Sequence, residues 1–343
     1  MGPLMIDLES TVMNARERQL LMNPAVAGVI LFTRNYESPE QLAALTQSIR
    51  AARSSKLLIA VDHEGGRVQR FRSGFSAIPA AGALGRLYDE DKPRALKAAE
   101  YAGWLMASEL RAVGIDFSFA PVLDLDVGIS DVIGDRAFHS TADGITQLSL
   151  RFVYGMKQAG MIAVAKHFPG HGSVKADSHV AYPIDQRSLV DLQLNDLLPF
   201  QRHIQNHIAA IMPAHVIYPQ VDVLPAGFSA VWIQQILRQQ MGFAGAVISD
   251  DISMQAADVV GDYSQRVATA LNAGCDLILL CNHPEDAQRV CEQYRDIEIA
   301  PDALARRIHL YAHNQVEDLE ALHLTDEWQA ARDYLAIYCT AET

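Results

Sequence analysis

The chain has 343 residues, half of them hydrophobic and 20% charged, which is the composition of a folded protein rather than a disordered one. Its formal net charge of −13 argues against nucleic acid or an anionic membrane surface as the main partner. No run of about 18 apolar residues occurs and the first residues lack a basic segment, so we expect neither a transmembrane helix nor a signal peptide and predict a cytoplasmic protein. The four cysteines lack the spacing of zinc ligands and are expected to be reduced thiols.

Short apolar runs alternate along the chain with longer helical patterns, which is typical of repeated strand–helix units around a parallel sheet. The expected strands are Leu4–Leu8, Gly28–Phe32, Leu57–Val61, Phe117–Leu123, Ile162–His167, Ala209–Pro213, Ala246–Ser249 and Asp276–Leu280. Eight strands with interleaved helices predict an α/β fold, a single (β/α)8 TIM-type barrel. A doubly wound open sheet is the alternative, but no Gly-x-Gly-x-x-Gly follows an early strand. We expect residues 1–343 to form one catalytic domain, with helices from about residue 300 to 343 packed on the barrel.

Helix start and stop signals lie between these strands. Ser38-Pro39-Glu40 offers an N-cap, a proline at the first helical position and an acid in the first turn. Four expected helices end just before a glycine, namely Pro93–Val113, Asp143–Ala159, Ser229–Met241 and Asp262–Ala273. Pro199 should kink or split the helical pattern Ser188–Asn206. Further helical patterns cover Pro284–Asp296, Ala303–Leu319 and Asp326–Tyr338.

The densest group of chemically active side chains is KHFPGHGSVKADSH, from Lys166 to His179, directly after an apolar run. Barrels keep their catalytic groups just past the carboxyl ends of the strands, which favours a functional site here. A glycine-rich loop with solvated histidines is the structural alternative. For His171, between two glycines, we favour hydrogen bonding to the backbone of the loop.

A carboxylate also follows the expected strand Ala246–Ser249. Asp250 is the first polar group after Ser249 and is the better candidate to face the barrel mouth, because a buried carboxylate is costly unless it is used or paired. Such a carboxylate could attack the anomeric carbon of a sugar. For Asp251 or Ser253 we expect the structural role of helix N-cap.

Sugar hydrolysis also needs a proton donor for the leaving oxygen. Asp177-Ser178-His179 offers a histidine beside a carboxylate, which would fix its tautomer and stabilise its charged form. Such triplets are common on protein surfaces, so this one gains weight from sharing a loop with Lys166 and His167.

Polar groups that could hold a sugar follow two other strands. Asp62 and Arg70 flank the turn at Gly65-Gly66, and Arg136 lies on the long loop after the fourth strand. Arg67 is expected to be a salt-bridge partner of Glu64.

Together, KHFPGHG with Asp-Ser-His, VDHEGGRVQRF, GDRAF and the stretch Leu237–Asp250 resemble glycoside hydrolase family 3, in order and spacing, from about residue 3 to about 285. More narrowly they resemble its single-barrel bacterial β-N-acetylhexosaminidases of peptidoglycan recycling. The family's pattern is broken at His63, where many relatives carry Gln, and at Ala246, which is smaller than usual.

The resemblance implies a retaining mechanism with Asp250 as nucleophile, His179 as acid/base and Asp177 as its partner. It further implies that terminal N-acetylglucosamine is bound by Asp62, Arg70, Arg136, Lys166 and His167. The implied substrate is N-acetylglucosamine β-1,4-linked to anhydro-N-acetylmuramic acid, with or without stem peptide, and no metal or other cofactor is expected. We expect a monomer or a weak homo-oligomer.

Three alternatives differ in chemistry. A phosphorylase would use phosphate instead of water, since a histidine acid/base does not repel that anion. A metal-dependent hydrolase would use His167, His171, His179 and Asp177 as zinc ligands, although Lys166 would oppose a cation. A sugar-binding protein without activity would not turn over a chromogenic N-acetylglucosaminide.

Overall fold

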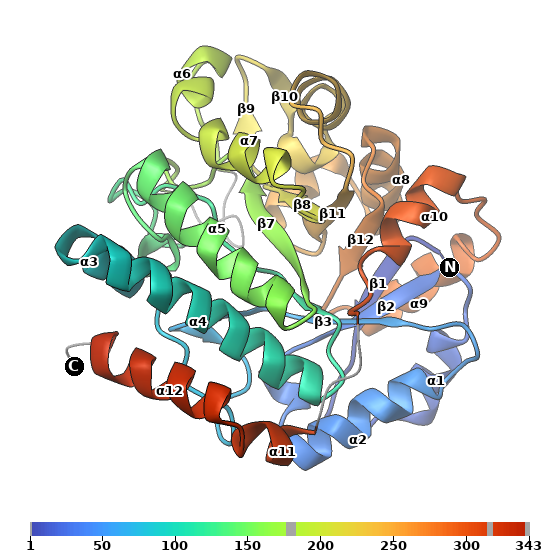
Figure 1. Cartoon of the computed structure of the whole chain (residues 1–343). Helices are drawn as coiled ribbons and strands as arrows, with labels where there is room; N and C mark the ends of the chain where they lie inside the picture. Colours follow the sequence, from blue (N-terminus) through green and yellow to red (C-terminus); the bar gives the residue numbers. More distant parts are fainter. Residues whose placement is uncertain (1, 176–182, 314–317, 340–343) are drawn as a thin grey trace.

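The computed structural model describes residues 2–175, 183–313 and 318–339. Eight parallel strands pair in the order β1-β12-β11-β8-β7-β6-β3-β2 and close on themselves. The barrel strands are β1 (Leu4–Asp7), β2 (Val26–Leu31), β3 (Leu58–Val61), β6 (Phe117–Ser118), β7 (Ile162–Phe168), β8 (Ala210–Pro213), β11 (Ala246–Asp251) and β12 (Leu277–Leu280). The predicted (β/α)8 barrel is therefore confirmed, and a barrel strand overlaps each expected one; most of these strands are labelled in Figure 1.

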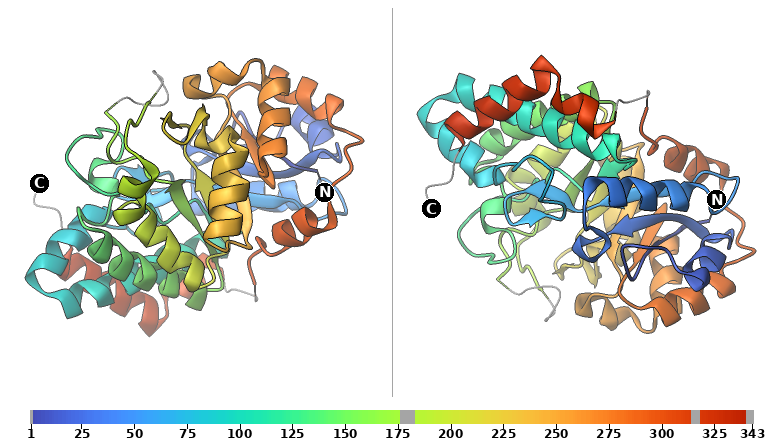
Figure 2. Two further views of the ribbon diagram at one scale, coloured as in Figure 1. Left: turned by 90° about the horizontal axis from the view of Figure 1, so that it is seen from above. Right: turned by 90° about the horizontal axis from the view of Figure 1, so that it is seen from below.

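Helices surround the barrel and connect its strands (Figures 1 and 2). They are α1 (Ala15–Leu21), α2 (Pro39–Arg50), α3 (Ala81–Glu90), α4 (Lys92–Ala112), α5 (Ala142–Gln158), α6 (Leu189–Leu194), α7 (Leu197–Gln205), α8 (Tyr263–Ala273) and α9 (Pro284–Gln293). A π-helical segment, η4 (Val231–Gln240), connects β8 to β11, and short 3-10 turns are η1 (Thr33–Asn35), η2 (Gly134–Arg136), η3 (Ala226–Phe228) and η5 (Gln255–Val260). Two small hairpins, β4 (His63–Gly65) with β5 (Val68–Gln69) and β9 (Ile217–Tyr218) with β10 (Asp222–Pro225), extend loops beyond the barrel. No helix in the described part of the chain is long and apolar enough to cross a membrane.

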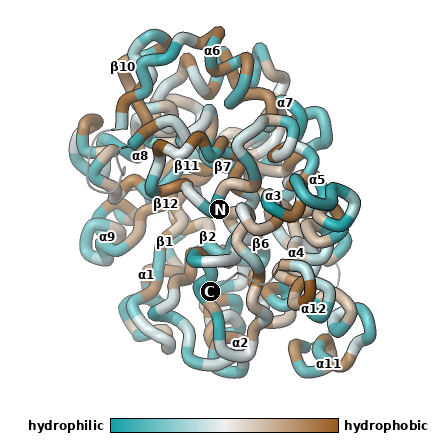
Figure 3. The backbone as a smooth tube through the Cα atoms, turned by 90° about the vertical axis from the view of Figure 1, so that its left-hand side faces the viewer, coloured by the Kyte–Doolittle hydropathy of each residue, from teal (hydrophilic) through white to brown (hydrophobic). Residues whose placement is uncertain are grey.

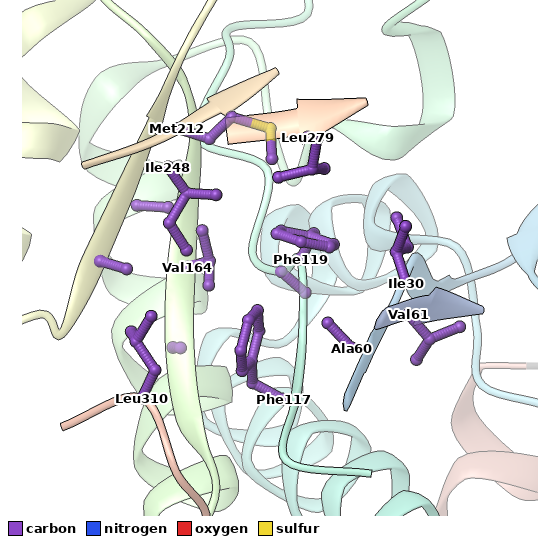
Figure 4. Close-up of a cluster of buried hydrophobic side chains, with 14 of the residues drawn as sticks. Ile30, Ala60, Val61, Phe117, Phe119, Val164, Met212, Ile248, Leu279 and Leu310 are labelled. Carbon is purple, nitrogen blue, oxygen red and sulfur yellow. The ribbon is translucent and has the colours of Figure 1, made fainter. Parts of the chain in front are cut away.

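The barrel interior is filled by apolar side chains. Figure 4 shows Phe117 and Phe119 between Val164 and Ile248 on one side and Ile30 on the other, and the two phenylalanine rings meet edge to face at 5.3 Å. Along the helices around the barrel, hydrophilic residues alternate with hydrophobic ones (Figure 3). The apolar interior matches the expected pattern for parallel strands buried on both faces.

Several expected boundaries were wrong for identifiable reasons. The strand expected over Phe117–Leu123 is regular only at β6, because Pro121 has no N–H to continue the ladder. The segment Ser188–Asn206 does split, but between α6 and α7; Pro199 sits in the first turn of α7, where its missing N–H costs nothing. The predicted N-cap Ser38 is confirmed, since its side chain accepts from the Gln41 N–H.

The C-terminal segment contains α10 (Pro301–Ile308), α11 (Leu319–His323) and α12 (Asp326–Tyr338), so the helix expected over Ala303–Leu319 ends early. After α10 the chain turns, and Leu310 lies at the end of the apolar cluster near Phe117 (Figure 4). Figure 1 shows α12 alongside α4, where Trp328 Nε1 donates to buried Glu109 at 2.8 Å. The four cysteines are free and buried, as expected.

Candidate active site

A cavity of about 700 Å³ lies at the carboxyl ends of the barrel strands. Part of its lining is apolar: Ile30, Met212 and Leu279 line the cavity and also belong to the apolar cluster in Figure 4. All six predicted site residues in the described part of the chain line this cavity: Asp62, Arg70, Arg136, Lys166, His167 and Asp250. Asp177 and His179 lie outside the described residues.

Lys166 is the centre of a chain of alternating charges. From β7 its Nζ contacts Asp62 Oδ1 and Glu64 Oε1, each at 2.7 Å, and the side chain is only 3% exposed. Burial opposes the charge, but the two carboxylates outweigh it and hold the pKa of Lys166 above its ordinary value. Arg70 extends the chain at 3.8 Å from the other Asp62 oxygen. The ammonium group is therefore charged near neutral pH and held in position by both carboxylates.

Glu64, which the sequence suggested only as a partner of Arg67, joins the other end of this chain. Arg136 grips it through two parallel bonds, Nε to Oε2 at 2.9 Å and Nη2 to Oε1 at 2.8 Å. Burial raises the pKa of Glu64, but Arg136 and Lys166 outweigh it and hold that pKa far below its usual range. Arg67 instead pairs with Asp135 at 3.0 Å, so the expected Arg67–Glu64 bridge was wrong.

His167 is oriented by a carboxylate that the sequence analysis did not assign to the site. Asp124 is fully buried and lies 2.7 Å from His167 Nδ1; its other oxygen accepts the His171 N–H at 2.7 Å. Since a carboxylate only accepts, the proton belongs on Nδ1 and Nε2 stays available. Burial raises the pKa of Asp124, but His167 outweighs it and lowers that pKa.

His171 is bound through its main chain rather than its ring. Neither ring nitrogen has a partner within residues 2–175, 183–313 and 318–339, so the expected ring-to-backbone bond is not found there. Burial, followed by the charge of His167, lowers the pKa of His171, which keeps the ring neutral.

Asp250 stands at the end of β11 and faces the same cavity. Burial disfavours its charge, but His215, His167 and Lys166 among others outweigh that effect and lower the pKa of Asp250. Its Oδ1 also accepts the Asp251 N–H at 2.8 Å. An ionised carboxylate is thus held at the cavity wall near neutral pH, as a nucleophile requires.

Asp251 has a different role from its neighbour. Its oxygens accept from Ser253 N at 2.9 Å, Ser253 Oγ at 2.6 Å and Cys281 N at 3.2 Å. Burial raises the pKa of Asp251 to about 6. The expected N-cap role was wrong for both Asp251 and Ser253, because η5 begins after Met254 and has no side-chain cap.

Residues 4–309 match the family model described as "Glycosyl hydrolase family 3 N terminal domain". The chain belongs to glycosyl hydrolase family 3. The "Beta-hexosaminidase" of Thioalkalivibrio sulfidiphilus is 52% identical over 97% of this chain and 95% of the relative. That of Idiomarina loihiensis is 52% identical over 98% of this chain and 100% of the relative. As a family 3 member with such relatives, the protein is a glycoside hydrolase.

Solved structures of this family superpose closely on the barrel. NagZ from Neisseria gonorrhoeae in complex with N-trifluoroacetyl-D-glucosamine has a TM-score of 0.93 and 43% identity, covering 99% of this chain and 98% of that chain. The same Neisseria protein has also been solved in complex with zinc ion, with a TM-score of 0.92, 42% identity and the same coverage of 99% and 98%. In this family 3 chain, the described residues contain no group of three or more His, Cys, Asp or Glu that could hold a metal ion.

Proposed function

We propose that this glycoside hydrolase is a retaining, exo-acting β-N-acetylglucosaminidase. Its substrate would be N-acetylglucosamine β-1,4-linked to anhydro-N-acetylmuramic acid, with or without stem peptide, released during peptidoglycan turnover. The observation that carries this proposal is the ionised Asp250 in a cavity whose opposite groups are fixed hydrogen-bond donors and acceptors. The structural similarity to a protein solved with a glucosamine derivative supports the choice of sugar.

The paired charges suit the terminal sugar. Asp62 keeps lone pairs free to accept from sugar hydroxyls, while Lys166 and Arg70 supply donors. Arg136 and His167 would contact other polar groups of the same ring. Because these side chains are already held by their partners, binding would cost little side-chain ordering.

In the proposed reaction an Asp250 oxygen attacks the anomeric carbon and forms an ester bond as the glycosidic C–O bond breaks. His179 gives its proton to the departing oxygen, while Asp177 stabilises the charged imidazole. In the second step His179 takes a proton from water, whose oxygen attacks the anomeric carbon and releases Asp250. Two inversions leave the β configuration unchanged.

The test is hydrolysis of an aryl β-N-acetylglucosaminide by wild type and Asp250→Ala, with and without phosphate. Asp131→Asn is the matched control, because Asp131 is another carboxylate at the cavity wall but is exposed. We expect turnover in both buffers, its loss only in Asp250→Ala, and formation of an α-glycosyl azide when azide replaces the missing nucleophile. Turnover only with phosphate would indicate a phosphorylase, and wild-type rates in Asp250→Ala would refute the nucleophile assignment.

The natural substrate needs a separate experiment. Mass spectrometry should show free N-acetylglucosamine released from the anhydro disaccharide and from its peptide-bearing form. Activity on aryl glycosides without activity on either fragment would contradict the proposed substrate while leaving the chemistry intact.

A further inference from the structure

His215 is a buried histidine behind the cavity wall that the proposed reaction does not use. It follows β8, is 1% exposed, and stacks on Phe228 with 4.9 Å between ring centroids and 9° between planes. On another side, a Cβ added at Gly227 would lie 3.2 Å from Nδ1, so the ring has almost no free space. The imidazole is therefore held in one orientation.

This orientation directs one ring nitrogen at the strand that carries Asp250. Nε2 lies 3.2 Å from the carbonyl oxygen of Asp251. A carbonyl oxygen can only accept, so Nε2 carries the proton. Burial lowers the pKa of His215, although the neighbouring charge of Asp250 acts in the opposite direction. Nδ1 has no partner in the described part of the chain.

Residue 251 links this bond to the carboxylate. Its carbonyl accepts from His215, and its N–H donates to Asp250 Oδ1 at 2.8 Å. The next carbonyl, of Ile252, accepts from Arg266 Nη1 at 2.8 Å. The backbone that aims Asp250 is thus fastened by two side chains from outside the strand.

We propose that His215 is a positioning residue for Asp250: by holding the carbonyl of residue 251 it fixes the backbone of that residue, whose N–H holds the carboxylate toward the cavity. This inference rests on the proposed function, in which Asp250 is the nucleophile. His215 does not touch the sugar; it limits the directions from which the carboxylate can attack. Fixing a reacting group within a fraction of an ångström is worth large factors in rate.

Other groups also influence Asp250 and are unchanged by altering His215. His167 and Lys166 face it from β7, His171 from the loop that follows, and Asp251 from its own strand. Because these groups keep their residue types in a His215 variant, a change in the titration of Asp250 that is absent from the control variant is attributed to the His215 ring.

The experiment compares His215→Leu, which removes the donor, with His215→Gln, which keeps an amide donor. His203→Gln is the matched control: His203 is also 1% exposed and contacts a backbone carbonyl, that of Pro199 at 2.8 Å, but this carbonyl lies on α7 and not on the strand that carries Asp250. The measurements are kcat and KM for the aryl glycoside, and the pH dependence of kcat/KM.

For His215→Leu we expect kcat to fall about 10- to 100-fold with little change in KM, as is typical when a partner that orients a reacting group is removed. The acid limb of kcat/KM, which reports the free carboxylate, should move to higher pH. His215→Gln, which keeps a donor but not the charge of the ring, should recover most of the loss in kcat, and His203→Gln should leave the limb in place. Equal losses in all three variants with an unmoved limb would overturn the proposal, because they would show a purely structural role.

If His215→Leu does not fold, Gly227→Ala gives an independent test, because its methyl would press on the ring and leave both hydrogen-bonding atoms present. A lower kcat with unchanged KM is expected, and wild-type kcat would count against positioning. Azide rescue of Asp250→Ala separates the two proposals: without rescue the nucleophile assignment fails, whereas rescue combined with a normal His215→Leu refutes only the positioning role.

Discussion

Replacing Glu64 by Gln tests whether the charge chain at the cavity wall is a single unit. Glu64 is the carboxylate between two cations, Arg136 and Lys166, at 2.7–2.9 Å. Gln has the same shape and can still accept one hydrogen bond, but it lacks the charge. The change therefore leaves packing intact and removes the compensation for two buried positive groups.

The expected loss of stability can be estimated from burial. Removing one partner of a buried ion pair costs about 3–5 kcal/mol, because the remaining charge is uncompensated. Lys166 keeps Asp62 at 2.7 Å, and Arg136, 12% exposed, borders the open cavity. We therefore expect the free energy of unfolding to fall by about 2–3 kcal/mol at pH 7, somewhat below the fully buried case. Asp135→Asn, which breaks the half-exposed pair with Arg67, should cost no more than about 1 kcal/mol.

The pKa of Glu64 determines how its contribution to stability changes with pH. The pKa of Glu64 is far below its ordinary value of about 4.5 in the folded state. Its charge therefore stabilises the folded protein fully above pH 4.5, and this contribution is lost as pH falls toward the folded pKa. The difference between wild type and Glu64→Gln should accordingly shrink at acidic pH.

Urea unfolding followed by the fluorescence of the buried tryptophans would measure these differences at several pH values. Turnover should fall as well, because Arg136 and Lys166 would lose the group that aims them at the sugar. A loss below about 1 kcal/mol at pH 7, no larger than that of the exposed pair, would refute the reasoning, as would a difference that stays constant from pH 7 to pH 3.

Two further substitutions address the imidazoles. His179→Ala should slow substrates with poor leaving groups far more than activated aryl glycosides, which need little protonation; equal losses measured with a leaving-group series would make His179 a binding residue. Asp124→Asn should lower kcat/KM about 10- to 100-fold, because an amide no longer selects the Nδ1–H tautomer of His167. Steady-state kinetics with a folding check by circular dichroism would measure this, and wild-type kcat/KM would show that Asp124 serves the loop alone.

The barrel was predictable because its strands are short apolar runs that end in polar residues, and these signals are local. Errors arose where tertiary contacts decide a boundary. α6 and α7 separate at Asn195 and Asp196, and Asp196 is bound by Arg187 through two contacts at 2.7 and 3.0 Å. α10 ends before Leu310, whose side chain is buried in the core after the chain has turned. Neither constraint has a signal in the helical period.

The six described residues expected to meet the sugar do line one cavity, because strand ends converge at the mouth of a barrel. The residues that hold these groups in position were not predicted. Asp124 follows a predicted strand, yet only the fold shows that it meets His167 and the His171 main chain, 43 and 47 residues later in the chain. Glu64 was assigned to the wrong arginine because Arg67 is near it in sequence, whereas Arg136 is near it in space.

The residues expected to contact the sugar were predictable and the residues that support them were not, and this difference has a physical cause. Groups that bind a polar substrate at the mouth of a barrel are polar and lie at the strand ends or on the loops that follow them, so residue type and position reveal them. A supporting group need only match its partner, and it can come from any element that packs nearby, as His215 does from the loop after β8 toward β11. Substitutions of the residues expected to contact the sugar should therefore change substrate binding first. Substitutions of Glu64, Asp124 and His215 should instead change the orientation of contacting groups that remain present. The ratio of the effects on kcat and on KM distinguishes the two.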